Sequence, residues 1–253
     1  MRVIVTRPAA QAAEWVGLLG VQGLDAVALP LIGIEAVDDP EPLAAAWQAL
    51  PQCRLAMFVS ANAAQHFFAH RPAGQAWPTS VQAASPGPGT TQALVALGVP
   101  ADAIVEPAAD AAQFDSEALW QRLRTQDWRA AEVLVVRGEG GREWLIDRLA
   151  DAGAHVTPVV AYRRVAPHLD VSEQAVLQAA LAAPGVHLWF FSSSEAIGHL
   201  ASLVAPTHEW SRALALATHP RIAARARQLG ITRVLESRPA LNEVIACIQS
   251  IRP

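Results

Sequence analysis

Short runs of apolar residues alternate along the chain with longer stretches in which apolar residues recur at helical spacing. The short runs are rich in Val, Ile, Leu and Ala, which is typical of strands buried on both faces of a parallel sheet. Their alternation with helical stretches predicts an α/β fold with parallel strands. The strands are expected at Arg2–Val5, Ala26–Leu29, Leu55–Val59, Val81–Ala84, Ala103–Val105, Glu132–Val136, His155–Val160, His187–Phe191, Ala213–Ala217 and Arg233–Leu235.

Helices are expected between the strands, for example at Gln11–Leu19, Thr91–Leu97, Arg142–Ala152 and Arg221–Leu229. A glycine follows each of these stretches, and the four are Gly23, Gly98, Gly153 and Gly230. Glycine is preferred there because many helices end on a residue in the left-handed conformation.

The chain also contains an internal repeat of two kinds of unit, A and B, in the order A, B, A, B. In the B unit, Phe58–Asn62 resembles Phe190–Ser194, which lies 132 positions later. The same offset separates Pro88 from Pro220 farther along the chain. Each B unit reads as strand, serine loop, helix, strand, proline loop, helix and strand, so a duplication of whole structural units is indicated.

The A unit contains a strand, an arginine loop, a helix and a second strand. Val3–Arg7 resembles Val133–Arg137 at an offset of 130, so the order of units implies two similar domains. The repeat itself leaves open which A unit shares a domain with which B unit. The segments after the A units, Leu29–Val37 and Val159–Val165, are extended and β-branched. Interpreted as paired crossover strands, they favour a domain made of the first A unit and the second B unit.

Composition narrows the classes of function. With 253 residues, 52% of them hydrophobic, the chain can form one large domain or two small ones. A net charge of −4 gives no electrostatic footprint for nucleic acid, and 17% charged residues exclude a disordered chain. All 19 basic residues are arginines, which excludes a Schiff-base, pyridoxal-phosphate or Walker-type lysine. Any bound anion is therefore expected to be held by Arg, His, hydroxyl or backbone N–H groups.

Neither metal binding nor membrane insertion is indicated. Cys53 and Cys247 lie among apolar residues, outside any Cys-x-x-Cys or His-rich cluster, so we expect buried thiols and no metal site. Met1 leads directly into a strand without a signal peptide, and no apolar run is long enough to cross a bilayer. We expect a cytoplasmic protein without a membrane or nucleic-acid partner.

Small, polar or arginine residues stand where several strands lead into helices. These junctions are Thr6–Pro8, Ser60–Asn62, Gly87–Thr90, Arg137–Gly141, Ser192–Ser194 and Thr218–Arg221. In parallel sheets ligands bind beyond these carboxyl ends, where the free N–H groups of the following helix attract anions. The alternative for each single loop is an ordinary helix N-cap. The glycines at 138–141 lack the full dinucleotide-binding spacing, which argues against a nicotinamide cofactor.

Tyr162 is the only tyrosine in the chain. One interpretation gives it a buried ring and a hydroxyl in water. In the other interpretation, the hydroxyl donates a proton to a leaving group or shares a proton with it. Of the eight histidines only His219 lies in one of the loops, and Trp15, Trp47 and Trp144 are expected in the core.

The stretches that carry a family resemblance are Val5–Pro8, Ser60–Ala63, Gly87–Thr90, Arg137–Glu143, Gly153–Val156 and Tyr162–Arg164. In this order and at these spacings the chain resembles the uroporphyrinogen-III synthase family over nearly its whole length. The resemblance implies two flavodoxin-like parallel-sheet domains joined by a two-stranded β-ladder, and a monomer. Domain 1 is then expected at residues 1–34 plus 166–253, domain 2 at 38–162, and the linker strands at about 30–37 and 159–166.

The resemblance also implies the reaction. The substrate would be hydroxymethylbilane, bound in the interdomain cleft without a metal or an organic cofactor. Loss of its terminal hydroxyl as water leaves an azafulvene, which the substituted α-carbon of the last pyrrole attacks. The resulting spiro intermediate breaks and closes again with the last ring inverted. Because the bilane can also close unaided to the unrotated isomer, the protein would act largely by orientation, with the substrate's carboxylates as handles.

By the same resemblance Tyr162 matches the family's candidate for assisting loss of the hydroxyl. The expected substrate-binding residues are Thr6, Arg7, Ser60, Asn62, Gly87, Gly89, Thr90, Arg137, Gly138, Ser192, Ser193, Ser194, His219 and Arg221. The family's usual Gly-Pro-Thr-Thr loop is replaced here by His219–Ile222, so we hypothesise that Arg221 clamps a carboxylate in place of the lost hydroxyl. A second departure is Ser85–Pro86, where an apolar strand end is usual.

Other functions fit parts of the same pattern. A non-catalytic two-domain cleft protein that binds a small anionic ligand would show the same repeat and the same loops. An FMN protein of the flavodoxin type would need a hydroxyl-rich phosphate loop after the first strand, where this chain has Thr6-Arg-Pro-Ala9. A module of a larger complex is a further alternative.

Overall fold

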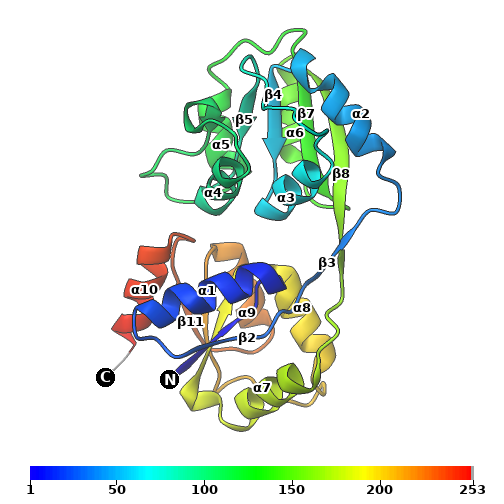
Figure 1. Ribbon diagram of the computed structural model, residues 1–253. Helices are drawn as coiled ribbons and strands as arrows, with labels where there is room; N and C mark the ends of the chain where they lie inside the picture. Colours follow the sequence, from blue (N-terminus) through cyan, green and yellow to red (C-terminus); the bar gives the residue numbers. More distant parts are fainter. Residues whose placement is uncertain (252–253) are drawn as a thin grey trace. The chain divides into compact units, whose positions relative to one another are not determined.

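The apolar runs form strands throughout residues 1–251, the part of the chain that the computed structural model describes (Figure 1). The strands are β1 (Arg2–Val5), β2 (Ala26–Ala28), β3 (Gly33–Ala36), β4 (Leu55–Phe58), β5 (Gln82–Ala84), β6 (Ile104–Val105), β7 (Glu132–Gly138), β8 (His155–Val165), β9 (His187–Phe191), β10 (Leu214–Ala217) and β11 (Arg233–Glu236). Every predicted strand is present, and its first and last residues lie within one residue of the prediction. The exceptions are β7 and β8, which extend farther at their C-terminal ends. The prediction of an α/β fold is confirmed.

Helices follow most of the strands. They are α1 (Ala9–Val21), α2 (Glu41–Ala49), α3 (Ala61–Ala69), α4 (Pro88–Ala96), α5 (Ser116–Leu123), α6 (Trp144–Asp151), α7 (Val171–Ala182), α8 (Ser194–Leu203), α9 (Pro220–Gln228) and α10 (Leu241–Ser250). The four glycines expected after helices have positive φ angles, of 68° at Gly23, 96° at Gly98 and Gly153, and 108° at Gly230. Glycine is needed at these points because other residues are strained in that conformation.

The strands form two sheets. The five-stranded sheet has the order β11-β10-β9-β1-β2, and the six-stranded sheet has the order β3-β8-β7-β4-β5-β6. The neighbours from β2 to β11 in the first sheet, and from β8 to β6 in the second, pair in parallel. The strands of the first A unit thus share a sheet with those of the second B unit. Contacts between residues divide the chain into two compact units, residues 1–33 with 165–253 (unit 1) and residues 34–164 (unit 2).

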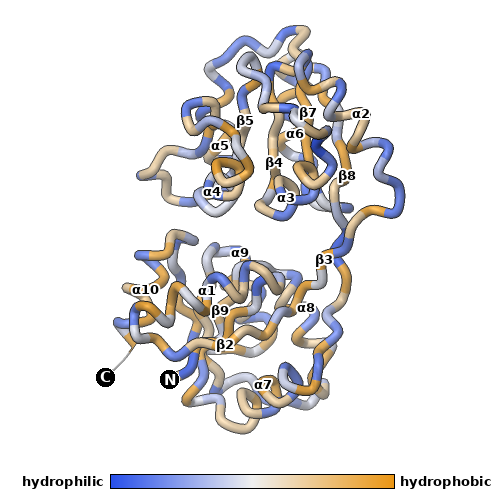
Figure 2. Tube along the Cα trace, in the orientation of Figure 1, coloured by the Kyte–Doolittle hydropathy of each residue, from blue (hydrophilic) through white to orange (hydrophobic). Residues whose placement is uncertain are grey.

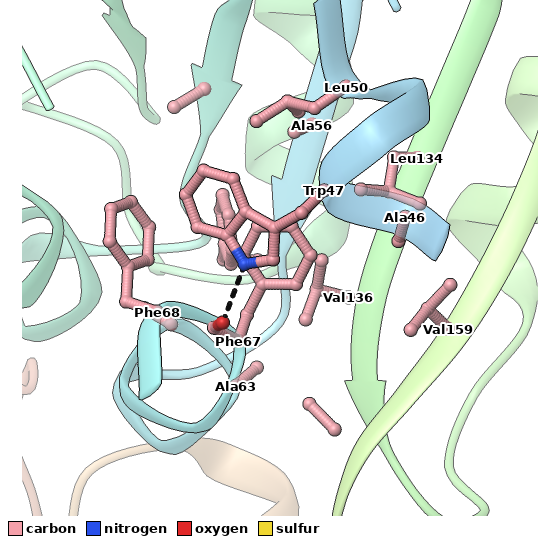
Figure 3. Packing of buried hydrophobic residues seen from close by; sticks show 14 of the residues in the cluster. Ala46, Trp47, Leu50, Ala56, Ala63, Phe67, Phe68, Leu134, Val136 and Val159 are labelled. Atoms are coloured by element: carbon pink, nitrogen blue, oxygen red, sulfur yellow. Dashed lines mark hydrogen bonds between the residues drawn. The ribbon is translucent and has the colours of Figure 1, made fainter. Parts of the chain in front are cut away.

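The sheet of unit 2 is covered by helices on both faces, as the side chains of β7 illustrate. Leu134 and Val136 pack into the cluster that contains α2 and α3 residues, whereas Val133 and Val135 face α5 and α6. This alternation follows from the pleat of a strand. At the centre of the first cluster Trp47 is fully buried (Figure 3). Its indole Nε1–H donates to the carbonyl of Phe67 at 2.8 Å, so burial leaves this polar group satisfied.

The sheet of unit 1 packs in the same manner. Val3 and Val5 of β1 and Phe190 of β9 contact α1 and α10 in one apolar cluster. Figure 2 shows apolar residues along the strands and apolar residues alternating with polar ones along the helices. The burial of these continuous apolar strands is the main stabilising contribution to each unit.

One expectation about burial is wrong, and a second holds only in part. Cys53 and Cys247 are half-buried rather than buried, although burial still raises the pKa of both thiols. Trp15 and Trp144 are only partly buried, although both pack against the apolar core clusters. An arginine guanidinium lies over each of these indoles, at 4.7 Å from the ring centroid for Arg7 over Trp15 and at 5.5 Å for Arg148 over Trp144.

Candidate functional site

The strand order identifies one position in each sheet where two of the predicted site loops lie side by side. β1 lies beside β9 in unit 1, and β7 lies beside β4 in unit 2. The connections on the two sides of such a position run in opposite directions, which leaves a crevice at the carboxyl ends of the strands. The predicted loops 6–8 and 192–194 follow the first pair, and loops 137–141 and 60–62 follow the second.

Tyr162 of β8 lies next to this position in unit 2. The residue is only 1% exposed, so the interpretation that places its hydroxyl in water is wrong. The hydroxyl Oη lies 3.1 Å from Oγ of Ser60 and accepts a hydrogen bond from Nη2 of Arg164 at 3.2 Å. A buried hydroxyl needs such partners because an unmet hydrogen bond costs about 1–3 kcal/mol.

Gly138 provides the space for the Tyr162 ring. The two residues are register partners in the pairing of β7 with β8, just after an irregularity between Arg137 and Gly138. A Cβ atom at position 138 would lie 2.7 Å from Cζ of Tyr162 and 3.0 Å from its hydroxyl oxygen. Such contacts are shorter than any that real side chains make, so the close approach requires glycine.

Ser60 has two roles in the structure. It is the N-cap of α3, where its Oγ accepts from the N–H of Ala63 at 3.1 Å, and it also contacts the Tyr162 hydroxyl. The N-cap interpretation of this serine is therefore confirmed, and its contact with Tyr162 is compatible with a role in the site. Asn62, on the first turn of α3, is partly exposed.

Arg137 is 8% exposed and is engaged with its own loop. Its Nη1 donates to the carboxylate of Glu143 at 3.2 Å, and its Nη2 donates to the carbonyls of Gly140 at 2.6 Å and Gly141 at 3.2 Å. The φ angles of these two glycines are 71° and 104°, which holds the loop in a turn that curls back over the guanidinium. Arg137 thus holds the loop after β7 in its conformation.

The loop of Gly87–Thr90 is fixed from behind by Ser85. Ser85 is fully buried, and its hydroxyl donates to the carbonyl of Gly87 at 2.8 Å while accepting from the Gly87 N–H at 3.2 Å. This accounts for a polar residue where an apolar strand end was expected. Gly87 precedes α4 with the Phe114 side chain 3.0 Å from where its Cβ would be, Thr90 is buried, and Gly89 is exposed.

Thr6 and Arg7 follow β1 in unit 1. Thr6 is buried and its hydroxyl donates to the carbonyl of Phe190 at 2.8 Å, which ties the end of β1 to β9. The Arg7 guanidinium lies 4.7 Å from the ring centroid of Trp15, and its buried Nε has no hydrogen-bond partner within residues 1–251. Burial lowers the pKa of Arg7 to about 10, which leaves it a cation at neutral pH.

The remaining predicted residues of unit 1 lie at the N-termini of α8 and α9. Ser193 accepts from the N–H of Glu195 at 3.1 Å, with Ser192 partly exposed and Ser194 exposed beside it. The side chain of His219 caps α9 by accepting from the N–H of Arg221 at 3.0 Å. Arg221 is exposed, as a carboxylate clamp requires.

Sequence reasoning missed two side chains beside Tyr162. Arg164 has no expected role of its own, although its position two residues after Tyr162 on one strand puts both side chains on the same face. The His66 ring centroid lies 5.7 Å from that of Tyr162, and burial and the nearby His70 lower the His66 pKa. The spacing of His66 in the sequence carries no signal for this contact. Ile222, where the family usually has threonine, packs into unit 1 at 8% exposure.

Residues 1–251 contain no cluster of three or more His, Cys, Asp or Glu side chains placed to hold a metal ion. Within the same residues, no helix combines the length and apolarity needed to cross a membrane.

These features define an α/β protein with two parallel sheets whose carboxyl-end loops carry arginine, hydroxyl and N–H donors. The family model for "Uroporphyrinogen-III synthase HemD" matches residues 13–246. The uroporphyrinogen-III synthase of Salmonella typhimurium is 30% identical over 244 residues, with 91% of this chain and 92% of the relative covered. The enzyme of that name from Escherichia coli is 30% identical over 239 residues, with the same coverage. The chain therefore belongs to the uroporphyrinogen-III synthase family.

Solved structures support the fold. A mutant uroporphyrinogen III synthase from Thermus thermophilus superposes with a TM-score of 0.60 at 19% identity, covering 99% of this chain and 96% of the other. The uroporphyrinogen-III synthetase of Helicobacter pylori has a TM-score of 0.59 at 15% identity, with both chains fully covered. At sequence identities of 19% and 15%, the similarity shows the α/β fold alone.

Proposed function

We propose that this protein is an enzyme of haem biosynthesis that cyclises hydroxymethylbilane to uroporphyrinogen III. The reaction is a lyase reaction, in which one water is lost and the last pyrrole ring is inverted. The observation that carries the proposal is the buried contact of Tyr162 with Ser60 over Gly138, in a chain whose family match spans residues 13–246. These three residues come from separate strands and loops, and each lies in a stretch that carries the family resemblance.

The loops at the carboxyl ends of the strands supply the groups that such a substrate needs. We propose that its carboxylates are bound by loop residues of each unit, namely Thr6, Arg7, Ser60, Asn62, Gly87, Gly89, Thr90, Arg137, Gly138, Ser192, Ser193, Ser194, His219 and Arg221. A hydrogen bond to a charged group contributes about 1.5–3 kcal/mol, so a few of them suffice to hold one folded conformation of the bilane. Orientation then decides which carbon attacks the azafulvene.

Arg7 is well suited to this task in unit 1. Its guanidinium is a desolvated cation whose Nε lacks a hydrogen-bond partner within the described residues. A bound carboxylate would supply the missing acceptor. Arg137, in contrast, already donates to Glu143 and to its own loop. We propose that Arg137 acts on the substrate chiefly through the loop conformation that it maintains.

The two compact units are proposed to be the functional domains, each of the flavodoxin type. Counted as A strands followed by B strands, both sheets have the spatial order 2-1-3-4-5, which is the order of flavodoxin-like sheets. In the six-stranded sheet β3 adds to the edge beside β8, which supports a linker of two paired strands. We further propose a cytoplasmic monomer that works without a metal or organic cofactor.

A product-isomer assay tests the function. Freshly made hydroxymethylbilane is incubated with the protein, the products are oxidised, and the uroporphyrin isomers are separated by chromatography. Predominantly isomer III, formed faster than in a protein-free control, is the expected result. Isomer I alone, at the rate of that control, would refute the proposal.

A further inference from the structure

Ser60 stands between the Tyr162 hydroxyl and the loops where substrate would bind. Tyr162 is 1% exposed, whereas Ser60 is partly exposed at the carboxyl end of β4 and the start of α3. The Tyr162 hydroxyl lies 3.1 Å behind Oγ of Ser60. Of the two hydroxyl-bearing residues, Ser60 is therefore the one with surface open to a substrate, whereas Tyr162 is covered.

The donors around these two hydroxyls fix the direction of their hydrogens. Within residues 1–251 the Tyr162 hydroxyl has two hydrogen-bond partners, and one of them, Nη2 of Arg164, can only donate. Tyr162 can therefore satisfy its own hydrogen only by donating to Oγ of Ser60. This arrangement is favoured because a buried hydroxyl hydrogen without an acceptor costs about 1–3 kcal/mol.

Oγ of Ser60 then accepts two hydrogen bonds, one from Tyr162 and one from the N–H of Ala63 at 3.1 Å. A hydroxyl oxygen has two acceptor positions, so both are filled. The hydrogen of Ser60 is left to point away from these donors, which leaves it available to a further acceptor. The partial positive charge at the start of α3 makes this hydroxyl a better donor.

From this geometry we propose that Ser60 is the catalytic residue that donates the proton to the leaving hydroxyl, and that Tyr162 and Arg164 are positioning residues that act through it. The inference rests on the proposed function. As the C–O bond breaks, its electron pair leaves with the oxygen, which takes the Ser60 hydrogen and departs as water. The Tyr162 hydrogen moves to Oγ of Ser60, and the Arg164 guanidinium stabilises the negative charge that remains on the Tyr162 oxygen.

Ser60 and Tyr162 thus form a proton relay, and this relay is restored within the same reaction. The pyrrole nitrogen supplies the electrons that replace the broken C–O bond, and the cyclised product later loses one proton. Return of that proton to Tyr162 through Ser60 regenerates both hydroxyls, so the net change is the loss of one water. No oxidant, metal or further reactant enters the step.

Single and double variants separate a relay from two independent donors. Ser60→Ala and Tyr162→Phe should each lower kcat for isomer III about 100-fold, the lower end for acid–base catalysis. The double variant should also lose about 100-fold, because each change breaks the same chain. Independent donors would instead give a loss of about 10,000-fold in the double variant. Tyr162→Phe should leave KM unchanged, since Tyr162 does not touch the substrate.

Further variants distinguish the chemistry from loss of a helix cap. Ser60→Thr keeps both the cap and the hydroxyl and should retain most of the wild-type kcat. Asp170→Ala removes the N-cap of α7, where the Asp170 carboxylate accepts from the Glu173 N–H at 2.8 Å. Like the loss of the Ser60 cap in Ser60→Ala, it should lower the free energy of unfolding by about 1 kcal/mol, but kcat should be unchanged.

Three outcomes would overturn the relay. They are multiplied losses in the double variant, a wild-type kcat for Ser60→Ala, and equal losses for Ser60→Thr and Ser60→Ala. In each of these cases the wild-type protein still makes isomer III, so the proposed function stands. A wild-type protein that makes only isomer I would instead overturn the function and the relay together.

Discussion

Gly138→Ala should displace the Tyr162 hydroxyl. The added Cβ would lie 2.7 Å from Cζ, 2.9 Å from Cε2 and 3.0 Å from Oη of Tyr162. Carbon atoms in contact are about 3.5–4.0 Å apart, so the ring would have to retreat by about 1 Å. The backbones cannot separate easily, because β7 pairs with β8 and the Glu139 N–H donates to the Tyr162 carbonyl at 2.9 Å. The ring would move, and its hydrogen bond to Ser60 would be lost.

The expected cost combines two effects. Overpacking a well-packed site costs about 1–3 kcal/mol, and the lost hydrogen bond adds about 1 kcal/mol. The free energy of unfolding should therefore fall by about 2–4 kcal/mol in urea denaturation, and isomer III turnover should fall to the level of Tyr162→Phe.

A matched control and a second background make this test decisive. Gly17→Ala on α1 adds a Cβ with no atom within 4 Å, so it should leave the protein as stable or about 0.5–1 kcal/mol more stable. In a Tyr162→Ala background the clash is gone, and Gly138→Ala should cost little. A full loss of stability in that background, or none in the wild type, would refute the reasoning.

Three further predictions concern other parts of the chain. Arg221→Ala should raise KM for hydroxymethylbilane with little change in kcat, and an unchanged KM would remove Arg221 from the site. Hydrogen bonds from Arg129 hold the pKa of Asp127 at about 2, below its usual 3.8, so Asp127 stabilises the fold above pH 3.8 and loses this effect as the pH falls toward 2. The stability difference between wild type and Asp127→Asn, followed by urea denaturation, should therefore shrink over that range. Trp47→Phe removes the bond to the Phe67 carbonyl and should lower the free energy of unfolding by about 1–3 kcal/mol, and an unchanged urea midpoint would contradict this.

The strands and helices could be predicted because each depends on a local pattern. A strand buried on both faces must be a continuous apolar run, as at His187–Phe191, where predicted and observed ends coincide. The helix ends were equally local, since Gly98 and Gly153 stand where positive φ angles are needed. Between His155 and Val165 the sequence predicts two segments, a strand at His155–Val160 and a crossover strand at Val159–Val165. Hydrogen bonding with β7 and β3 joins them into the single strand β8.

Contacts within the candidate site depend on pairing between strands, which a single sequence does not encode. The approach of Tyr162 to Gly138 arises from the register of β8 on β7 and an irregularity after Arg137. No local signal marks the Arg137 bonds to its own loop, because the same residues in an open loop would leave the guanidinium free. The buried hydroxyl of Ser85 likewise acquires its role only from the turn that places Gly87 above it.

The internal repeat shows how the two units differ chemically. The A units are related by an offset of 130, so the position of Tyr162 in unit 2 corresponds to Ile32 in unit 1, and that of Gly138 corresponds to Pro8. Ile32 is 6% exposed and has no hydrogen to donate. Unit 1 can thus offer arginine, hydroxyl and N–H groups for binding, but nothing equivalent to the hydroxyl behind Ser60. If both units descend from one ancestral half, polar donors at the strand ends are the shared property, and the proposed proton relay is specific to unit 2.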